Sequence, residues 1–322
     1  MSRRIRLAVV MDPIEDIKYA KDTTLAMLLA AGKRGYELSY MTQPDLYLRD
    51  GVARGRARPL EVRADPASWF TLGEATDTAL GEFDVILMRK DPPFDMEFIY
   101  TTYILDRAEL AGALVVNRPA GLRDMNEKVY TAWFPEFCAP TLVTRDMASM
   151  AEFAREFDRV VVKPLDGMGG RSIFVVDRKD KNLNVVFETL TQYGTRFAIV
   201  QKYLPEIVTG GDSRVLVIDG QPAPYALARM PSGDDNRGNL AAGAKGVARE
   251  LTARDRELVA GIGPRLAERG MLFVGLDVIG GCVTEINVTS PTGVREIDKA
   301  FGTDIAMLLI DAIDKRLAAR KH

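Results

Sequence analysis

Strand and helix patterns alternate along the first third of the chain. Apolar, β-branched runs predict buried strands at residues 5–11, 36–41, 84–89 and 113–117. Helical patterns lie between them, and the clearest span residues 22–34 and 96–110. This alternation is typical of a parallel α/β sheet. Ligands bind beyond the carboxyl ends of such strands, where the polar residues are Asp12, Arg89 and Asn117.

The pattern changes further along the chain. Residues 50–67 are rich in arginine and proline and predict an exposed β excursion without assigned chemistry. From about residue 124, strand pairs and shorter helices are expected. The predicted helices span residues 126–134, 185–193, 252–269 and 304 to the C-terminus. A hairpin over residues 215–229 should turn at Asp219-Gly220. Residues 231–246 form a long polar loop, which is usually functional or disordered, and we interpret it as a lid.

A second hairpin, near the C-terminus, carries the strongest chemical signal. Two β-rich segments flank Gly280-Gly281, and this pattern predicts paired strands. Glu285 and Asn287 are two residues apart, so they share one face of their strand. Asp277 joins that face if the loop has three residues, 280–282, because a two-residue turn would place it on the opposite face. We therefore expect a three-residue loop.

Oxygen ligands from two strands of this hairpin suit a divalent metal. Carboxylates and an amide are the donors that Mg²⁺, or Mn²⁺, accepts together with substrate phosphates. The alternative is the solvated acidic face of an ordinary hairpin. The apolar neighbours of Asp277 and the neutral amide of Asn287 favour the metal site.

A glycine-rich loop lies between two further β-branched runs. The first run ends at Lys163, and the loop consists of Gly167, Met168, Gly169 and Gly170. Glycines let backbone N–H groups approach phosphate oxygens. The loop is not a Walker A motif, because no Lys-Ser or Lys-Thr follows and the next element is a predicted strand. An ordinary hairpin is the alternative, and the adjacent lysine and the distant acidic residues favour phosphate binding.

Composition excludes several classes of function. The net charge is −2 over 322 residues, which gives no electrostatic case for binding nucleic acid or an anionic membrane. No apolar run reaches the roughly 18 residues that span a bilayer. His322 is the one histidine, so a Ser-His-Asp or Cys-His mechanism is excluded and zinc is not expected. Cys138 and Cys282, the two cysteines, fit a reducing cytoplasm.

Together these features resemble the ATP-grasp superfamily, whose members join a carboxylate to an amine through an acyl phosphate. The resemblance is closer still to the bacterial glutathione synthetase family, and it runs from about residue 5 to the last helix. The blocks that carry it span residues 10–13, 86–94, 123–128, 131–134, 163–170, 237–243 and 284–292. One departure is Arg171, where the family often has a small residue.

The resemblance implies a mixed α/β architecture, an ATP-grasp fold with an N-terminal parallel α/β domain. The implied parts are the N-terminal domain (1–123), a lid subdomain with the glycine loop (124–203) and a C-terminal subdomain with the magnesium site (204–322). Lys128 and Lys163 would neutralise the α- and β-phosphates of ATP, and Asp212 would hold the ribose. The segment that would read adenine consists of Gln201, Lys202, Tyr203 and Leu204.

Two arginines are expected to act on the second step of the implied reaction. When an amine attacks an acyl phosphate, a tetrahedral oxyanion forms, and Arg214 and Arg229 are placed to stabilise it. For each arginine the alternative is a surface ion pair. Asn239, from the predicted lid, is a third catalytic candidate. The sequence offers no convincing general base for the amine, and neither cysteine fits a catalytic role.

The resemblance also implies the substrates, γ-glutamylcysteine and glycine. The candidates for holding substrate charges are Asp12, Arg89 and Arg295. The turn at residues 290–293 offers N–H groups and the hydroxyls of Ser290 and Thr292 to a small carboxylate, although it also fits a simple strand-ending turn. The resemblance further implies a homotetramer that binds small molecules. The net charge disfavours nucleic acid and membrane as partners, and the two cysteines fit the cytoplasm.

Three hypotheses remain at this point. The first is a ligase of the glutathione synthetase type. The second is another ATP-grasp carboxylate–amine ligase, of the D-alanine type or acting on an amino acid. The third is a nucleotide-binding protein with a decayed site. The N-terminal blocks favour the first, and the presence of Lys128, Lys163, Asp277, Glu285 and Asn287 disfavours the third.

Overall fold

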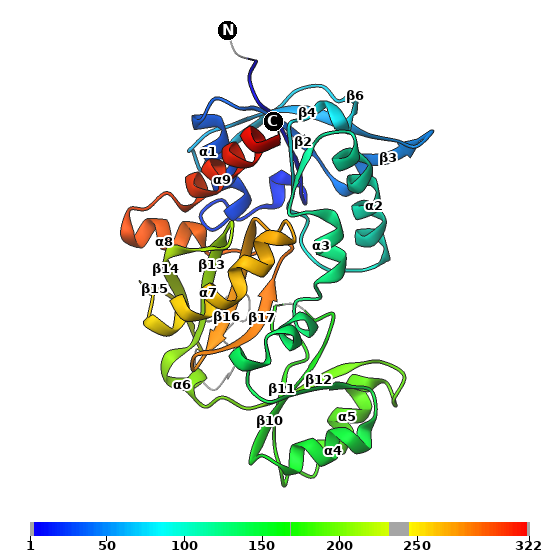
Figure 1. Ribbon diagram of the computed structural model, residues 1–322, viewed down its shortest axis with the longest axis vertical. Helices are drawn as coiled ribbons and strands as arrows, with labels where there is room; N and C mark the ends of the chain where they lie inside the picture. Colours follow the sequence, from blue (N-terminus) through cyan, green and yellow to red (C-terminus); the bar gives the residue numbers. More distant parts are fainter. Residues whose placement is uncertain (1–2, 168, 232–244, 321–322) are drawn as a thin grey trace.

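The computed structural model describes residues 3–167, 169–231 and 245–320. Three β-sheets follow one another along an elongated molecule (Figure 1). The N-terminal sheet lies at one end, the C-terminal sheet in the middle, and a small sheet at the other end. The last described helix, α9 (Ile305–Arg320), returns to the N-terminal end and packs against α1 (Thr23–Lys33).

The N-terminal part has the parallel core that the sequence predicted. Its strand order is β3-β4-β2-β1-β7-β8, with β1 parallel to β2 and β7, and β7 parallel to β8. The parallel strands are β1 (Arg6–Val10), β2 (Glu37–Met41), β7 (Val85–Met88) and β8 (Leu114–Val116). The helices that follow α1 are α2 (Met96–Leu110) and α3 (Pro119–Asp124). Short 3₁₀ turns are η1 (Ile14–Asp16), η2 (Gln43–Asp45) and η3 (Leu80–Glu82).

The prediction of an exposed excursion at residues 50–67 is only partly right. β4 (Val52–Val62) pairs antiparallel with β2 and extends the same sheet. Its other partners are β3 (Leu46–Arg49), β5 (Phe70–Leu72) and β6 (Thr76–Ala79). Ala53, Ala57 and Leu60 of β4 are buried, while Arg56 and Arg58 are exposed. β4 is therefore an amphipathic strand with one face in the core, and its exposed arginines obscured this pattern in the sequence.

The small sheet is fully antiparallel, in the order β11-β10-β12-β9. Its strands are β9 (Thr141–Thr144), β10 (Arg159–Pro164), β11 (Phe174–Asp177) and β12 (Ala198–Lys202). Two helices, α4 (Met147–Arg155) and α5 (Leu183–Thr191), pack on it around a core that contains Val162 and Phe187. This is the part of the chain that carries the glycine loop, between β10 and β11.

The helix predicted at residues 126–134 is largely absent. Only a 3₁₀ helix, η4 (Val129–Trp133), forms, followed by η5 (Pro135–Phe137). The side chain of Asn126 accepts hydrogen bonds from the N–H groups of Lys128 and Val129 at 3.1 and 3.0 Å, which fixes a local turn. Pro135 disfavours the α conformation at Phe134. Lys128 therefore lies in a turn rather than on a helix face.

The C-terminal sheet is antiparallel, in the order β15-β14-β13-β16-β17. Its strands are β13 (Asp212–Ile218), β14 (Gln221–Met230), β15 (Lys245–Glu250), β16 (Phe273–Ile279) and β17 (Cys282–Asn287). The accompanying helices are α6 (Glu206–Gly210), α7 (Ala253–Glu268) and α8 (Val294–Phe301). The predicted hairpin turn at Asp219-Gly220 is confirmed, and both residues have positive φ.

The loop of the β16–β17 hairpin differs from the prediction. Gly280 and Gly281 form a two-residue turn with φ values of 55° and 76°, and Ile279 pairs with Cys282. The register then shifts, so that Asp277 pairs with Glu285. The three-residue loop is therefore wrong, because the extra residue sits in β17 as a bulge at Thr284. The bulge restores the shared face that the loop was expected to provide.

Asn117 joins the N-terminal sheet to the C-terminal one. Its Nδ2 donates to the carbonyls of Phe273 and Val288 at 2.7 Å each, and its Oδ1 accepts from Phe273 N at 2.9 Å. Asn117 is 3% exposed, so these bonds replace water that burial removes. The polar residue expected beyond β8 thus serves the junction between the two sheets.

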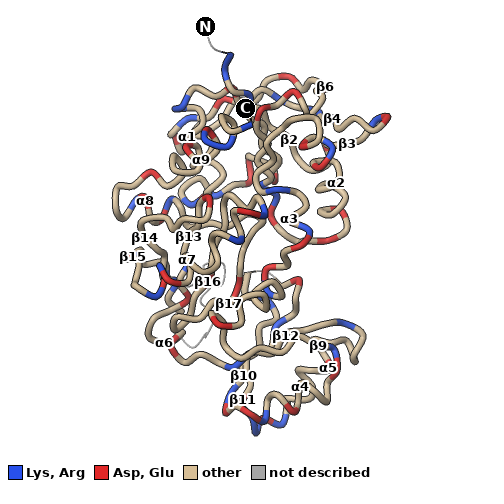
Figure 2. Tube along the Cα trace, in the orientation of Figure 1, with Lys and Arg blue, Asp and Glu red and all other residues tan. Residues whose placement is uncertain are grey.

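Charged residues of both signs are interspersed along the described trace (Figure 2). Among the residues that the structure describes, no helix combines the length and apolarity that a bilayer crossing requires.

Candidate active site

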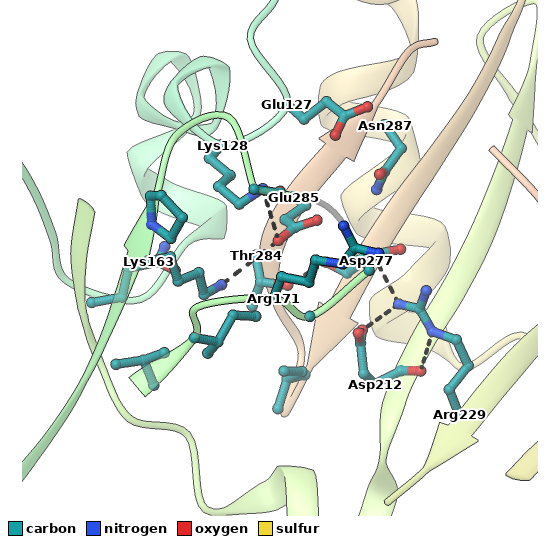
Figure 3. Close-up of a pocket in the computed structure, with 18 of the residues that line it drawn as sticks. Glu127, Lys128, Lys163, Arg171, Asp212, Arg229, Asp277, Thr284, Glu285 and Asn287 are labelled. Carbon is teal, nitrogen blue, oxygen red and sulfur yellow. Dashed lines mark hydrogen bonds and ion pairs between the residues drawn. The ribbon is translucent and has the colours of Figure 1, made fainter. Parts of the chain in front are cut away.

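A cavity of about 920 Å³ lies where the small sheet meets the C-terminal sheet. Its walls include the glycine-loop residues Gly167, Gly169 and Gly170, the end of β12, and inward-facing residues of β13, β14, β16 and β17. The turn at residues 289–292 closes one side. Figure 3 shows charged side chains from these separate elements converging on this space. A cavity of this size fits a nucleotide-sized ligand.

The predicted metal ligands share one wall of this cavity. Asp277 and Glu285 face each other across β16 and β17, and Asn287 lies opposite Gly275 in the same ladder. The Nδ2 group of Asn287 donates to Gly275 O at 3.4 Å, so its amide oxygen is the atom that it would offer to a cation. At the bulge, Thr284 Oγ1 donates to the carbonyl of Asp277 at 3.3 Å.

Asp277 is the centre of a buried arginine network. Arg214 donates through Nε and Nη2 to its two carboxylate oxygens, at 2.6 and 3.1 Å. Arg229 reaches the same carboxylate at 2.9 Å and Asp212 at 2.5 Å. Burial would raise the pKa of Asp277, but the charges of Arg214 and Arg229 outweigh it and hold that pKa well below its usual range. The carboxylate therefore stays ionised.

Two buried lysines face the carboxylate of Glu285. Lys128 Nζ lies 3.6 Å and Lys163 Nζ 3.9 Å from its Oε1, as Figure 3 shows. Lys128 also donates to the carbonyl of Gly167 at 2.7 Å, which ties it to the glycine loop. Burial lowers the pKa of Lys163, and Glu285 partly opposes this effect. Two ammonium groups beside a glycine loop are suited to anionic oxygens.

Asp212 offers an unused hydrogen-bond acceptor. Its Oδ2 is paired with Arg229, whereas its Oδ1 is buried and finds no partner among the described residues. Burial raises the pKa of Asp212 to about 6, although Arg229 opposes the shift. A buried acceptor without a donor is costly, and a ligand hydroxyl would satisfy it. This observation fits the expected ribose contact.

The segment at the end of β12 lines another side of the cavity. Gln201 is buried and donates to Thr141 Oγ1 at 3.1 Å. The N–H groups of Lys202 and Tyr203 donate to Pro140 and Arg159 carbonyls at 3.0 and 3.1 Å. An adenine ring at this wall would therefore rely on carbonyl groups and on Leu204 for its backbone contacts.

The donor set fits a magnesium ion that arrives with phosphate. The described residues contain no group of three His, Cys, Asp or Glu side chains that could hold a metal. Asp277, Glu285 and Asn287 supply two carboxylates and one amide oxygen instead, and both carboxylates already contact protein cations. Mg²⁺ is commonly bound through one or two carboxylates plus substrate phosphates, and this wall provides that partial set.

The predicted substrate residues divide into two groups. Ser290 and Thr292 line the cavity, and Arg214 Nη1 donates to Thr292 O at 3.4 Å. The other three, Asp12, Arg89 and Arg295, do not line it.

Each of these three has protein partners instead. Asp12 pairs with Lys90 at 2.8 Å. Arg89 is buried and donates to Thr24 Oγ1 at 3.1 Å and to Pro291 O at 3.0 Å, and burial lowers its pKa to about 10. Arg295 stacks over Tyr19, 4.6 Å from the ring centre.

Some residues of the cavity were missed by the sequence analysis, and two predicted ones cannot be placed. Asp91, Glu127 and Thr289 line the cavity without having been assigned. Asp91 and Glu127 each lie inside a resemblance block, next to a lysine, and that position was the available signal. Met168 and Asn239 lie outside the described residues.

Neither Cys138 nor Cys282 lines the cavity. Burial raises the pKa of Cys138 to about 12, and its thiol donates to Thr131 O at 3.4 Å. A thiol in this state is a poor nucleophile.

Comparison with solved structures identifies the fold. The fold is similar to that of the D-cycloserine synthetase DcsG, with a TM-score of 0.67 at 17% identity, covering 97% of this chain and 99% of that chain. It is also similar to the ATP-grasp ligase PsnB in complex with a minimal precursor, with a TM-score of 0.63 at 18% identity, covering 97% and 99%. The fold is that of an ATP-grasp protein.

Sequence comparison narrows this class to one family. The family models described as the N-terminal domain and the ATP-grasp domain of prokaryotic glutathione synthetase match residues 5–123 and 127–302. The glutathione synthetase of Pseudomonas syringae pv. tomato is 58% identical over 317 residues, covering 98% of this chain and 99% of the relative. That of Escherichia coli K12 is 54% identical over 313 residues, covering 97% and 99%. The chain belongs to the prokaryotic glutathione synthetase family and is an ATP-dependent carbon–nitrogen ligase.

Proposed function

We propose that this ligase joins the cysteinyl carboxylate of γ-glutamylcysteine to the amine of glycine, converting ATP to ADP and phosphate. The observation that carries the proposal is the cavity in which the Lys128–Lys163 pair and the Asp277–Glu285–Asn287 wall face the glycine loop. The relatives named glutathione synthetase match over nearly the full chain, which supports these two substrates over those of other ATP-grasp ligases.

In the first step, the carboxylate attacks the γ-phosphate of ATP, the bond to ADP breaks, and an acyl phosphate forms as ADP leaves. Positioning and charge neutralisation dominate phosphoryl transfer of this kind. Lys128 and Lys163 would bind the α- and β-phosphates, and the glycine loop would cover the chain of phosphates. Asp212 would accept from the ribose through its buried Oδ1, and residues 201–204 would hold the adenine.

A bound Mg²⁺, or Mn²⁺, would neutralise charge on the β- and γ-phosphates. Asp277, Glu285 and Asn287 are the residues that would hold it. Both carboxylates have cationic partners at 2.6–3.9 Å, so these partners would exchange contacts with the incoming phosphates. The protein's own role is to keep the oxygens on one wall.

In the second step, the amine attacks the acyl carbon, and phosphate leaves. Arg214 and Arg229 are the candidates for stabilising the oxyanion, because both are buried and line the cavity. They lie next to the wall formed by Asp277, Glu285 and Asn287, which we call the metal wall. Ser290 and Thr292, on the opposite turn, would bind a substrate carboxylate. For Asp12, Arg89 and Arg295, a direct role would require movement toward the substrate, since they lie outside the lining.

The oligomeric state and compartment complete the proposal. Met96, Tyr100 and Tyr103 form an exposed apolar face of α2, beside the exposed Leu48 and Val52 of β3 and β4. We propose this face as a contact between copies in a homotetramer, which light scattering on the purified protein would test. The two free cysteines support a reducing, cytoplasmic setting.

The test of the activity is phosphate release by the purified protein with ATP and Mg²⁺. γ-Glutamylcysteine and glycine are supplied singly and together, and the product is identified by mass. Release that requires both, with a tripeptide product, is the expected result. Release that ignores either substrate, or a requirement for a different acid or amine, would reject these substrates while leaving the ligase class intact.

A further inference from the structure

The segment from Asn287 to Thr292 is held by side chains that are distant in sequence, from residues 89–127 and from β13. It begins at a proposed metal ligand and ends at a proposed substrate residue. The side chains that bond it, at Val288 O, Thr289 Oγ1, Ser290 Oγ, Pro291 O and Thr292 O, belong to Asn117, Glu127, Asp91, Arg89 and Arg214 respectively. The position of this segment is therefore set by distant residues rather than by its own strand.

Among these, Glu127 makes two contacts that bracket Asn287, one of the three proposed metal ligands. Its carbonyl accepts from Ile286 N at 2.8 Å, between Glu285 and Asn287. Its side-chain Oε1 accepts from Thr289 Oγ1 at 3.0 Å. Figure 3 shows the carboxylate of Glu127 beside Asn287, on the side away from Asp212. Glu127 thus holds both ends of the short stretch from Ile286 to Thr289, which carries the proposed ligand Asn287 and directly follows Glu285.

The two neighbours of Glu127 in the sequence donate hydrogen bonds to the glycine loop and to the residues just before it. Lys128 Nζ donates to Gly167 O at 2.7 Å, and Asn126 Nδ2 donates to Leu165 O at 3.2 Å. Residues 126–128 therefore contact the glycine-loop segment on one side and the metal wall on the other. Because Lys128 follows Glu127 directly, we expect a displacement of Glu127 to move this lysine relative to Glu285.

We propose that Glu127 is a positioning residue. Its carboxylate oxygen accepts a hydrogen bond from Thr289, and this bond fixes residues 287–292 and the wall of proposed metal ligands relative to Lys128. The predicted effects on kcat and KM rest on the proposed function, whereas the predicted effect on the Kd for ATP does not. A glutamate here is unfavourable in one respect, since it places a second carboxylate near Glu285. An acceptor for the buried Thr289 hydroxyl explains why a polar group is needed at all.

The rival role is one of charge, in which the carboxylate itself binds a cation or an ammonium group. Glu127→Gln separates the two roles. Glutamine keeps an acceptor oxygen for Thr289 but removes the negative charge. Thr289→Val removes the hydroxyl at similar volume, and Thr289→Ser restores it. These three side-chain changes address one hydrogen bond from both of its ends.

The experiment compares Glu127→Ala, Glu127→Gln, Thr289→Val, Thr289→Ser and the double variant Glu127→Ala/Thr289→Val. Calorimetry measures the Kd for ATP in the presence of Mg²⁺, and steady-state kinetics gives kcat and the KM of each substrate. Glu127→Ala and Thr289→Val should each weaken Mg²⁺–ATP binding by about 3- to 10-fold, the range expected for one hydrogen bond. The double variant should be no worse than either single one. Gln and Ser should restore most of the loss.

Three results would overturn the proposal. If Glu127→Gln weakens ATP binding and activity as much as Glu127→Ala does, and Thr289→Val has no effect, the role of Glu127 is one of charge. Additive losses in the double variant would show that the two side chains act independently. Unchanged binding and kinetics in all variants would remove any role. Thermal melting identifies variants that fail to fold, and if Glu127→Ala does, the Thr289→Val and Thr289→Ser pair decides.

Failure of the proposed function would be seen separately. If the wild-type enzyme releases no phosphate with γ-glutamylcysteine and glycine, the substrates are wrong. The Kd for Mg²⁺–ATP would still be measurable in every variant, and its pattern would still test the role of Glu127.

Discussion

Arg214 and Asp277 face each other on the adjacent strands β13 and β16 and form a buried two-point ion pair, at 2.6 and 3.1 Å. Arg229 adds a third contact to the same carboxylate at 2.9 Å. The proposed metal ligand is thus already neutralised by two arginines. We infer that Mg²⁺ and the phosphates bind as a pair, because the phosphates can take over the arginine contacts that the metal displaces.

The geometry of this pair predicts the effect of Arg214→Lys. Lysine keeps the positive charge but cannot bind two oxygens in a fixed fork. We expect kcat to fall about 10²- to 10³-fold, as when one oxyanion donor is removed, and the KM for ATP to change less. Steady-state kinetics checks this result. Arg249→Lys is the matched control, since Arg249 pairs with Asp255 at 2.7 Å outside the cavity lining. An equal loss there would indicate a general structural effect.

Gly275 leaves the space that Arg214 occupies. A Cβ atom at this position would lie 2.7 Å from Arg214 Cδ and 3.0 Å from Pro291 Cβ. Gly275→Ala should therefore push Arg214 from Asp277 and lower kcat/KM by up to about 10²-fold. Gly210→Ala is the control, because nothing lies within 4 Å of its added Cβ. Normal kinetics in Gly275→Ala would mean that Arg214 can shift without loss of function.

The three hydrogen bonds that Asn117 makes between the two sheets predict that its substitution lowers stability. Asn117→Ala removes three hydrogen bonds and leaves buried groups of Phe273 and Val288 with fewer partners. We expect the free energy of unfolding to fall by about 2–4 kcal/mol. Denaturant unfolding measures the change, and Asn184→Ala, at an exposed position of α5, should stay within about 0.5 kcal/mol of wild type. Equal stabilities for both variants would contradict this prediction.

Local patterns account for most of the fold. The alternation of strands and helices gave the parallel core and placed α2 at its observed bounds, residues 96–110. The period of two gave the shared face of Glu285 and Asn287. These features depend on neighbours in sequence, so they can be read from the sequence without knowing the tertiary structure.

The features that the sequence did not reveal depend on contacts between distant residues. The bulge at Thr284 is decided by the pairing of β17 with β16, and no residue type marks it. The ion pair of Arg214 with Asp277 joins positions 63 residues apart. The turn at Lys128 depends on Asn126 and on the proline that follows, and the apolar pattern suggested a helix instead. Each error arose where a tertiary contact or a single side chain outweighed local periodicity.

The raised pKa of Asp212 predicts how stability depends on pH. Burial raises this pKa to about 6 in the folded protein, whereas an unfolded Asp titrates near 3.9. Between these values the folded state binds more protons than the unfolded state, so stability falls as the pH rises from about 4 to above 6. Asp212→Asn should remove this slope. Urea midpoints at pH 4.5, 6 and 8, without nucleotide, measure it. Asp158→Asn, whose side chain is 98% exposed, should keep the wild-type slope, and a slope unchanged in Asp212→Asn would show that another group controls it.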